Sequence, residues 1–216
     1  MKIVAFDVDG VILDSQLTYI EATNKTLEQY GVTKIPLGEF NKFNVCSLES
    51  WNNDVWRYIE DNCHEEIGEK GKYVADYVNN IDIVRANGSK LFDGMRDVIG
   101  ILNKNGTKIC IISNMAEWDF SKNILPLLQE VRIDFIRCRE GDLYKPNPKF
   151  LDLVLEHFGC EAREITYIGD LYEDYEFASL TGMDFIWAKW GYDNGRMGEV
   201  GGVKSAEAPR GLVEMV

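Results

Sequence analysis

The sequence is poor in basic residues and has no long hydrophobic run. Its 23 lysine and arginine residues stand against 36 aspartate and glutamate residues, giving a formal net charge of −13. Nucleic acids and anionic membrane surfaces attract basic proteins, so we expect neither of them as a partner. No apolar stretch approaches the length of about 20 residues that a transmembrane helix needs. A small anionic ligand is compatible with this composition, because a local cation can override the overall charge.

Cysteine and histidine are also scarce. The five cysteines are scattered, without any CxxC spacing, at Cys46, Cys63, Cys110, Cys138 and Cys160. An odd number of cysteines without paired spacing favours reduced thiols, and we therefore expect a cytoplasmic protein. We expect no signal peptide, because the first apolar run ends at Phe6 and acidic residues follow at once. The two histidines, His64 and His157, stand alone in or near helical patterns, and we expect structural rather than catalytic roles for both.

The stretch around which the chain is organised is residues 2–10, Lys-Ile-Val-Ala-Phe-Asp-Val-Asp-Gly. Its continuous apolar run predicts a strand that is buried on both faces of a sheet. Asp7 and Asp9 come at the end of this strand, and Gly10 is next. Two carboxylates at the end of a buried strand repel each other unless a cation or a proton compensates them. Alternatively, both are ordinary loop carboxylates that cap the following helix.

Beyond this stretch, the apolar pattern divides the chain into two parts. Between residues 15 and 90 apolar residues recur at helical spacing, and we expect a helical cap domain there. The cap is inserted into an α/β domain formed by residues 1–14 and 91–216, in which strand and helix patterns alternate. Predicted strands after the first cover roughly 108–112, 134–136, 164–168 and 184–188. This alternation predicts a doubly wound, mainly parallel, Rossmann-like sheet.

Three further segments carry predictions of their own. A helix that begins near Glu117 is expected to end or kink at Pro126. The glycine-rich segment between Gly191 and Gly202 matches no nucleotide-binding fingerprint, and we interpret it as a mobile surface loop. Residues 205–216 are expected to form a short closing helix that begins near Pro209.

Polar side chains follow several of the predicted strands. They are Asp7 and Asp9 after the first strand, Ser113 and Asn114 after the second, Lys145 in the loop after the third, and Asp170 after the fourth. Taken singly, each is typical of a helix cap or a surface charge. The carboxyl ends of parallel strands meet at one edge of a sheet, where open α/β sheets bind ligands. Together these residues therefore predict a single site.

The residue types in this predicted site suit phosphoryl transfer. Clustered carboxylates offer the hard oxygen ligands that Mg²⁺ prefers. The Ser113 and Asn114 side chains and the backbone N–H groups near Gly10 can donate to phosphate oxygens. Lys145 can offset part of the negative charge. An aspartate can attack phosphorus and form an aspartyl-phosphate.

Four ordered motifs resemble those of the haloacid dehalogenase superfamily. They are residues 7–15 (Asp-Val-Asp-Gly-Val-Ile-Leu-Asp-Ser), Ser113-Asn114, residues 145–148 (Lys-Pro-Asn-Pro) and residues 169–174 (Gly-Asp-Leu-Tyr-Glu-Asp). The resemblance spans nearly the whole chain and points to the phosphoglycolate-phosphatase-like branch, which carries a helical cap. The dehalogenases lack the second aspartate of the first motif, because a halide leaving group needs no proton. Asp9 therefore favours a phosphate substrate.

This resemblance implies a role for each site residue. Asp7 is the expected nucleophile. Asp9 is the expected general acid that protonates the leaving alcohol, and later the base for hydrolysis. Ser113 and Lys145 are expected to bind the phosphoryl group. Mg²⁺ is the expected cofactor, and its implied ligands are the Asp7 carboxylate, the Asp9 carbonyl and Asp170.

The last motif contains one more residue with an implied role and one departure from the family pattern. Asp174, one helical turn after the implied metal ligand, is expected to be an outer partner of the metal site or a ligand through water. Leu171 stands where this branch often has a small hydroxyl residue, so one hydrogen bond near the metal is expected to be absent. The departure at Leu171 removes no catalytic group.

We therefore predict a magnesium-dependent phosphatase that acts on a small phosphorylated metabolite through an aspartyl-phosphate. Phosphoglycolate, a sugar phosphate and a nucleotide monophosphate all fit as substrates. A phosphomutase of the same superfamily is an alternative, although we identify no cap residue that would assist a second transfer. A non-catalytic binding module that kept the fold is another, but it would have lost at least one of Asp7, Asp9, Lys145 and Asp170. The sequence leaves the oligomeric state open.

Overall fold

The computed structural model describes residues 2–36, 48–62, 69–86, 88–193 and 195–216. The chain folds into two compact units, one formed by residues 1–14 and 90–216 and the other by residues 15–89. The first unit, called the α/β unit below, contains a sheet with helices packed on it, and the second is built from helices. Among the described residues, no helix is long and apolar enough to span a bilayer.

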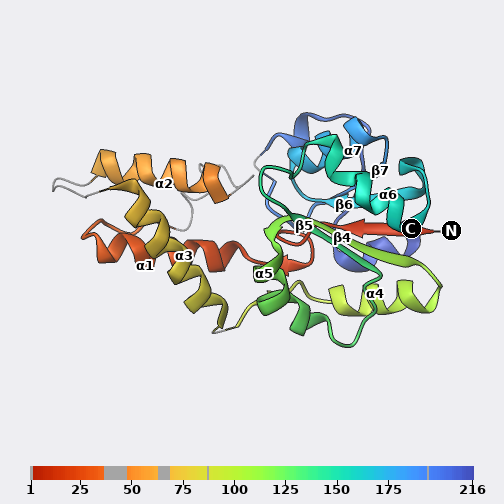
Figure 1. The fold of residues 1–216 in the computed structure, drawn as a ribbon, viewed down its shortest axis with the longest axis horizontal. Helices are drawn as coiled ribbons and strands as arrows, with labels where there is room; N and C mark the ends of the chain where they lie inside the picture. The colour runs from red at the N-terminus through yellow and green to blue at the C-terminus, as the bar shows by residue number, and fades with distance from the viewer. Residues whose placement is uncertain (1, 37–47, 63–68, 87, 194) are drawn as a thin grey trace. The chain divides into compact units, whose positions relative to one another are not determined.

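The α/β unit is built on a six-stranded sheet in which every neighbouring pair is parallel (Figure 1). In spatial order its strands are β5 (Phe135–Arg139), β4 (Lys108–Ala116), β1 (Ile3–Phe6), β6 (Ile165–Gly169), β7 (Asp184–Ala188) and β8 (Lys204–Ala206). The doubly wound parallel fold predicted from the sequence is confirmed. Since β1 lies between β4 and β6, the segments that follow these three strands share one edge of the sheet.

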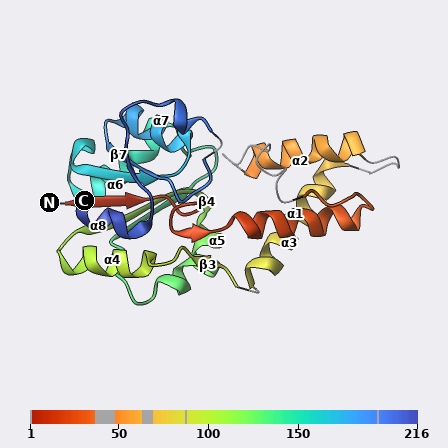
Figure 2. The ribbon, with the colours of Figure 1, turned by 180° about the vertical axis from the view of Figure 1, so that it is seen from behind.

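Helices cover both faces of this sheet, as Figures 1 and 2 show. The covering helices are α6 (Asp152–Phe158) and α7 (Tyr172–Thr181) on one face, and α4 (Met95–Lys104) and α8 (Leu212–Met215) on the other. The side chains of β1 alternate between the two hydrophobic cores, with Val4 and Phe6 in one and Ile3 and Ala5 in the other. All four are buried. Burial on both sides explains why this strand is a continuous apolar run.

The last residues of the chain agree with the prediction from Pro209 on, where helical segments begin, but differ from it before that residue. Residues 205–216 do not form one helix, because Ser205 and Ala206 belong to β8 and pair with β7. Two short helical segments follow, η7 (Pro209–Gly211) and α8. β8 has three residues, of which only Ala206 is buried, so it has no apolar run that would mark it as a strand. Its pairing with β7 determines its structure.

Two other segments also depart from their predicted limits. β4 runs on to Ala116, and its pairing with β5 shifts register between Ser113 and Ala116. The helix expected from Glu117 is divided into three pieces, α5 (Glu117–Asp119), a π-helical turn η2 (Phe120–Ile124) and a 3-10 turn η3 (Leu125–Leu128). Pro126 lies at the start of η3, where its missing N–H interrupts the helical bonding pattern as predicted.

The second unit has a core of its own. Its helices are α1 (Gln16–Gln29), α2 (Leu48–Asn62) and α3 (Lys70–Ala86). Tyr73 and Tyr77 of α3 are fully buried, and their stacked rings have centroids 6.1 Å apart. The Asn80 side chain of α3 donates to the hydroxyl of Thr26 in α1 at 2.9 Å. Within residues 15–36, 48–62, 69–86 and 88–89 there is no strand.

A two-stranded antiparallel ribbon marks the places where the chain leaves and re-enters the α/β unit. β2 (Leu13–Asp14) pairs with β3 (Lys90–Leu91), and Asp14 stands opposite Lys90. Only the turn that carries Asp7 and Asp9 separates this ribbon from the central strand β1.

Candidate active site

A tight turn after β1 places the first aspartates of the predicted site. The carbonyl of Val8 accepts hydrogen bonds from the N–H groups of Ile12 (2.9 Å) and Leu13 (2.8 Å), and the N–H of Gly10 donates to the carbonyl of Leu13 (3.0 Å). Gly10 has a φ of +78°, a conformation that residues with a Cβ rarely adopt. The turn closes on itself and leaves Asp7 buried at the end of β1.

Lys145 is the cation of this site. Its Nζ lies 2.9 Å from Oδ1 of Asp7 and 2.7 Å from Oδ1 of Asp174. It also donates to the hydroxyl of Tyr167 at 2.7 Å. An ammonium group has three N–H donors, and these three partners account for all of them. In the resting site, therefore, one of these bonds has to break before Lys145 can donate to a phosphate oxygen.

Asp174 organises the site from the first turn of α7. Its Oδ1 accepts hydrogen bonds from Lys145 and from the Tyr167 hydroxyl, the latter at 2.9 Å. Its Oδ2 accepts the backbone N–H groups of Asp170 and Leu171, both at 3.2 Å. With four donors on its two oxygens, Asp174 is better suited to hold Lys145 and the β6–α7 turn than to bind a cation directly. Leu171 contributes through its backbone, which does not depend on the missing hydroxyl.

The end of β4 brings Ser113 and Asn114 to the same edge of the sheet. Ile111 pairs in register with the last residue of β1, so Ser113 lies level with the turn that follows β1. The side-chain amide of Asn114 makes two hydrogen bonds with the backbone of Lys145. Its oxygen accepts the Lys145 N–H at 2.8 Å, and its NH₂ group donates to the Lys145 carbonyl at 3.1 Å. Ser113 is buried, and its Oγ accepts the N–H of Met115 at 3.1 Å. Asn114 thus fixes the Lys145 backbone, whereas the Ser113 hydroxyl keeps its own proton to donate.

Burial and mutual repulsion change the proton affinities of this cluster. Desolvation raises the pKa of Asp7 to about 7, although Lys145 lowers it in part and Asp174 raises it further. Burial, followed by repulsion from Asp174 and Asp7, holds the pKa of Asp170 well above its usual value. Burial by itself would lower the pKa of Lys145, but Asp174 and Asp7 outweigh it, so this pKa is raised and the ammonium stays charged. Three buried carboxylates lie close to a single ammonium, which contacts two of them, and the excess negative charge requires protons or a further cation.

The residues present fit a divalent cation. Carboxylate oxygens of Asp7, Asp170 and Asp174 lie within 4.8 Å of one another. Oδ1 of Asp170 is buried and has no hydrogen-bond partner within the described parts of the chain. Hard carboxylate oxygens are the ligands that Mg²⁺ prefers. Asp7 and Asp170 are therefore the side chains that could hold the ion, and the carbonyl of Asp9 stays a predicted ligand.

Two contributions to the site were missed by sequence reasoning. In the sequence, Tyr167 is one more residue of the apolar run that predicts β6. The apolar pattern gives no indication that its hydroxyl contacts Lys145 and Asp174. The prediction of a mobile surface loop is wrong at its start, because the N–H of Tyr192 donates to Oδ2 of Asp170 at 2.7 Å. One signal could have found this contact, since Gly191 follows closely after β7 as Gly10 follows β1.

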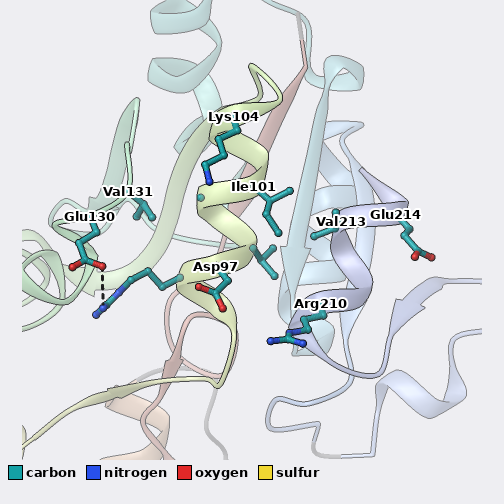
Figure 3. A pocket seen from close by; sticks show the side chains of 11 residues that line it. Asp97, Ile101, Lys104, Glu130, Val131, Arg210, Val213 and Glu214 are labelled. Carbon is teal, nitrogen blue, oxygen red and sulfur yellow. Dashed lines mark hydrogen bonds and ion pairs between the residues drawn. The ribbon is translucent and has the colours of Figure 1, made fainter.

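A surface groove elsewhere in the α/β unit is separate from this site (Figure 3). It lies between α4, the segment around Glu130 and Val131, and the region of α8, and its charged side chains are of both signs. Arg96 pairs with Glu130 along it at 3.4 Å. None of the predicted site residues lines this groove, so it has no part in the chemistry argued above.

Known proteins share the sequence and the fold of this chain. A family model described as haloacid dehalogenase-like hydrolase matches residues 4–188. A phosphoglycolate phosphatase of Xanthomonas campestris pv. campestris is 25% identical over 197 residues, which cover 88% of this chain and 84% of the relative.

Solved structures extend the comparison to the fold. The crystal structure of a predicted phosphoglycolate phosphatase from Haemophilus somnus matches with a TM-score of 0.82 at 14% identity, covering 100% of this chain and 97% of that one. A structure assigned as a β-phosphoglucomutase from Thermotoga maritima matches with a TM-score of 0.77 at 18% identity, covering 100% of this chain and 98% of that one. At these identities the structural matches establish the fold, which both kinds of enzyme share.

Proposed function

The chain belongs to the haloacid dehalogenase-like hydrolases, and we propose that it is a magnesium-dependent phosphatase that hydrolyses a small phosphate monoester through an aspartyl-phosphate on Asp7. The family match over residues 4–188 and the relative named as a phosphoglycolate phosphatase support a phosphatase. The observation that carries the proposal is the buried ion pair of Asp7 and Lys145, together with an Asp170 oxygen that has no hydrogen-bond partner among the described residues. A nucleophile, a cation and a carboxylate oxygen available to a metal thus meet at one edge of the sheet.

The proposed reaction has two halves, and both use the carboxylates of the β1 turn. In the first, an oxygen of Asp7 attacks phosphorus, the bond from phosphorus to the leaving alcohol breaks, and Asp9 gives its proton to that alcohol. In the second, Asp9 takes a proton from a water molecule whose oxygen attacks phosphorus, and the bond from phosphorus to Asp7 breaks. Inorganic phosphate leaves, and Asp7 and Asp9 return to their starting states.

Lys145 and Ser113 are proposed to bind the phosphoryl oxygens. When Asp7 bonds to phosphorus, its carboxylate loses its negative charge and no longer needs the Lys145 ammonium. One N–H of Lys145 is then free to donate to a phosphoryl oxygen, and the Ser113 hydroxyl can donate to another. Mg²⁺ bound by Asp7, Asp170 and the Asp9 carbonyl would neutralise charge on the phosphoryl group.

The substrate is proposed to be a small phosphorylated metabolite, with phosphoglycolate as the first compound to test because of the relative's name. The unit of residues 15–89 is proposed as the cap that sets specificity. The net charge of −13 supports a small metabolite over nucleic acid or a membrane surface as the partner. A cytoplasmic location is supported by the free thiols of Cys110, Cys138 and Cys160, whereas Cys46 and Cys63 lie outside the described residues.

Release of inorganic phosphate from a panel of phosphomonoesters tests the proposal. The panel contains phosphoglycolate, hexose phosphates and nucleoside monophosphates, each with Mg²⁺ and with EDTA. We expect turnover that EDTA and Asp7→Asn abolish and that Asp142→Asn, a change of an exposed carboxylate, leaves intact. Folded, magnesium-loaded protein that hydrolyses no member of the panel would contradict the function. Chromatography of the hexose phosphate reactions would reveal an isomerised product if the enzyme were a mutase.

A further inference from the structure

Tyr192 connects Asp170 to the ribbon through which the chain leaves the α/β unit. Its backbone N–H donates to Oδ2 of Asp170 at 2.7 Å. Its hydroxyl lies 3.3 Å from Oδ1 of Asp14 and 3.5 Å from the carbonyl oxygen of Leu13. Its ring packs beside that of Phe92, with centroids 6.3 Å apart. One residue thus contacts Asp170 with its backbone, and β2 and the Phe92 ring with its side chain.

The N–H of Tyr192 determines which oxygen of Asp170 is available to a cation. It occupies Oδ2, while Oδ1 stays buried without a hydrogen-bond partner among the residues that the structure describes. The two oxygens of a carboxylate turn together, so a bond that fixes one also fixes the other. Hydrogen bonds of this kind orient the ligands before the metal binds, and their loss lowers the metal affinity.

Residues 190–192 form a strap that is held at one end on the turn after β1 and at the other end on β2. The indole N–H of Trp190 donates to the carbonyl of Val11 at 3.0 Å, and the Tyr192 hydroxyl reaches the ribbon that follows the turn. Between them, Gly191 lies so close that a Cβ there would overlap Asp170 and stand 2.5 Å from the carbonyl oxygen of Gly10. The strap therefore presents the N–H of Tyr192 to Asp170 at one fixed position.

We infer that Tyr192 is a positioning residue for metal binding. Its side chain anchors the strap on Leu13 and Asp14, and the anchored backbone N–H holds Oδ2 of Asp170, so that Oδ1 is the oxygen left for a cation. The inference deepens the proposed function and rests on it, since it assigns Asp170 to the magnesium site. Loss of the anchor should weaken cation binding although every ligand is kept.

Binding of Mn²⁺ to the full chain without substrate, followed by electron paramagnetic resonance, tests this inference. Tyr192→Phe removes the hydroxyl and keeps the ring, and we expect the dissociation constant to rise about fivefold, the effect of one lost hydrogen bond. Tyr192→Ala removes the whole anchor and should weaken binding about tenfold or more. Tyr30→Phe is the matched control, because it removes a tyrosine–carboxylate hydrogen bond of 2.8 Å to Asp76 in the other unit. Asp170→Asn should abolish Mn²⁺ binding, so that the spectrum of free Mn²⁺ is no longer reduced by the protein.

A second readout separates positioning from a general loss of structure. Thermal unfolding without metal should give Tyr192→Phe a stability close to that of the parent protein. Its phosphatase activity should fall at low Mg²⁺ and return at saturating Mg²⁺, which a damaged fold would not do. The inference would be overturned if both Tyr192 variants bound Mn²⁺ with the affinity of the parent. It would also be overturned if the parent bound no Mn²⁺, or if Asp170→Asn still bound it. A parent that binds Mn²⁺ through Asp170 but hydrolyses no phosphomonoester would overturn the proposed function alone.

Discussion

The ammonium nitrogen of Lys145 lies 2.9 Å from Oδ1 of Asp7, and both residues are buried. An exposed ion pair of this length would contribute little to stability, because water and salt screen it. In a buried pair, removing one partner leaves the other as an uncompensated charge. These two side chains therefore affect the stability of the α/β unit, in addition to the roles proposed for them in the reaction.

Replacing Lys145 by methionine should destabilise the protein by about 3–5 kcal/mol at neutral pH, because Asp7 and Asp174 lose their shared cation. The loss should be smaller in acid, where protonated carboxylates need no cation. Lys149→Met is the matched control, since Lys149 is exposed and near in the chain. Urea unfolding measures the difference. Equal stabilities of the two variants would contradict the assignment of Lys145 as the cation of the site.

Asp7→Asn should remove a pH dependence of stability from the metal-free protein. Burial raises the pKa of Asp7 to about 7 from an ordinary value of 3.8, so the folded protein holds this proton more tightly than the unfolded chain. The stabilisation is complete below about pH 4 and is lost as the pH rises through about 7, by up to about 4 kcal/mol. Relative to Asp7→Asn, the parent should therefore lose stability between these pH values.

The measurement is chemical unfolding in EDTA at several pH values. Asp142→Asn serves as the control, because Asp142 is exposed and the variant should follow the parent. Parallel stability curves for the parent and Asp7→Asn would show that the Asp7 proton is not bound more tightly in the folded state.

Asp9→Asn should discriminate between leaving groups. An alkyl phosphate releases a strongly basic alkoxide unless a general acid protonates it, whereas p-nitrophenyl phosphate releases a stable phenolate. We expect kcat of the variant on an alkyl phosphate to fall about 10²–10⁴-fold. On p-nitrophenyl phosphate the rate of phosphoryl transfer to Asp7, measured as the burst of phenolate, should fall much less. Asp7→Asn should lose the burst entirely. Equal losses of Asp9→Asn on both substrates would remove the role of Asp9 as the acid.

Gly191→Ala should destabilise the protein by about 1–3 kcal/mol and weaken Mg²⁺ binding, because its Cβ would overlap Asp170 and the carbonyl of Gly10. Gly198→Ala is the matched control, since a Cβ there meets nothing within 4 Å. Thermal unfolding with and without Mg²⁺ gives both quantities for each variant. A Gly191 variant with the stability and the Mg²⁺ response of the Gly198 variant would show that the strap adapts without displacing Asp170.

The contrast between β1 and β8 shows what the sequence could predict about the fold. β1 is buried on both faces, so its apolar run is continuous and predicts a strand directly. β8 has three residues at the edge of the sheet and buries only Ala206. Its structure depends on pairing with β7, a contact between distant residues that the local pattern does not record. The same reason explains why the register shift at the end of β4 was not predicted.

The site shows a similar division. Asp7, Lys145 and Asp170 were predicted to be neighbours because parallel strands bring their carboxyl ends to one edge of a sheet. Tyr167 and Tyr192 were not predicted, because they act through a hydroxyl inside a buried strand and through a backbone N–H in a loop. A sequence pattern predicts where a charged group is placed, but the donors that orient it become visible only in three dimensions.

The pairing of β2 with β3 makes the inserted unit exchangeable. Asp14 and Lys90 stand opposite each other, so the two ends of the insertion meet across one strand pair, at a separation that a two-residue hairpin turn can close. In the described part of the chain between Asp14 and Lys90, no segment belongs to the six-stranded sheet. Segments of other lengths and shapes can therefore replace residues 15–89 without changing the register that places Asp7.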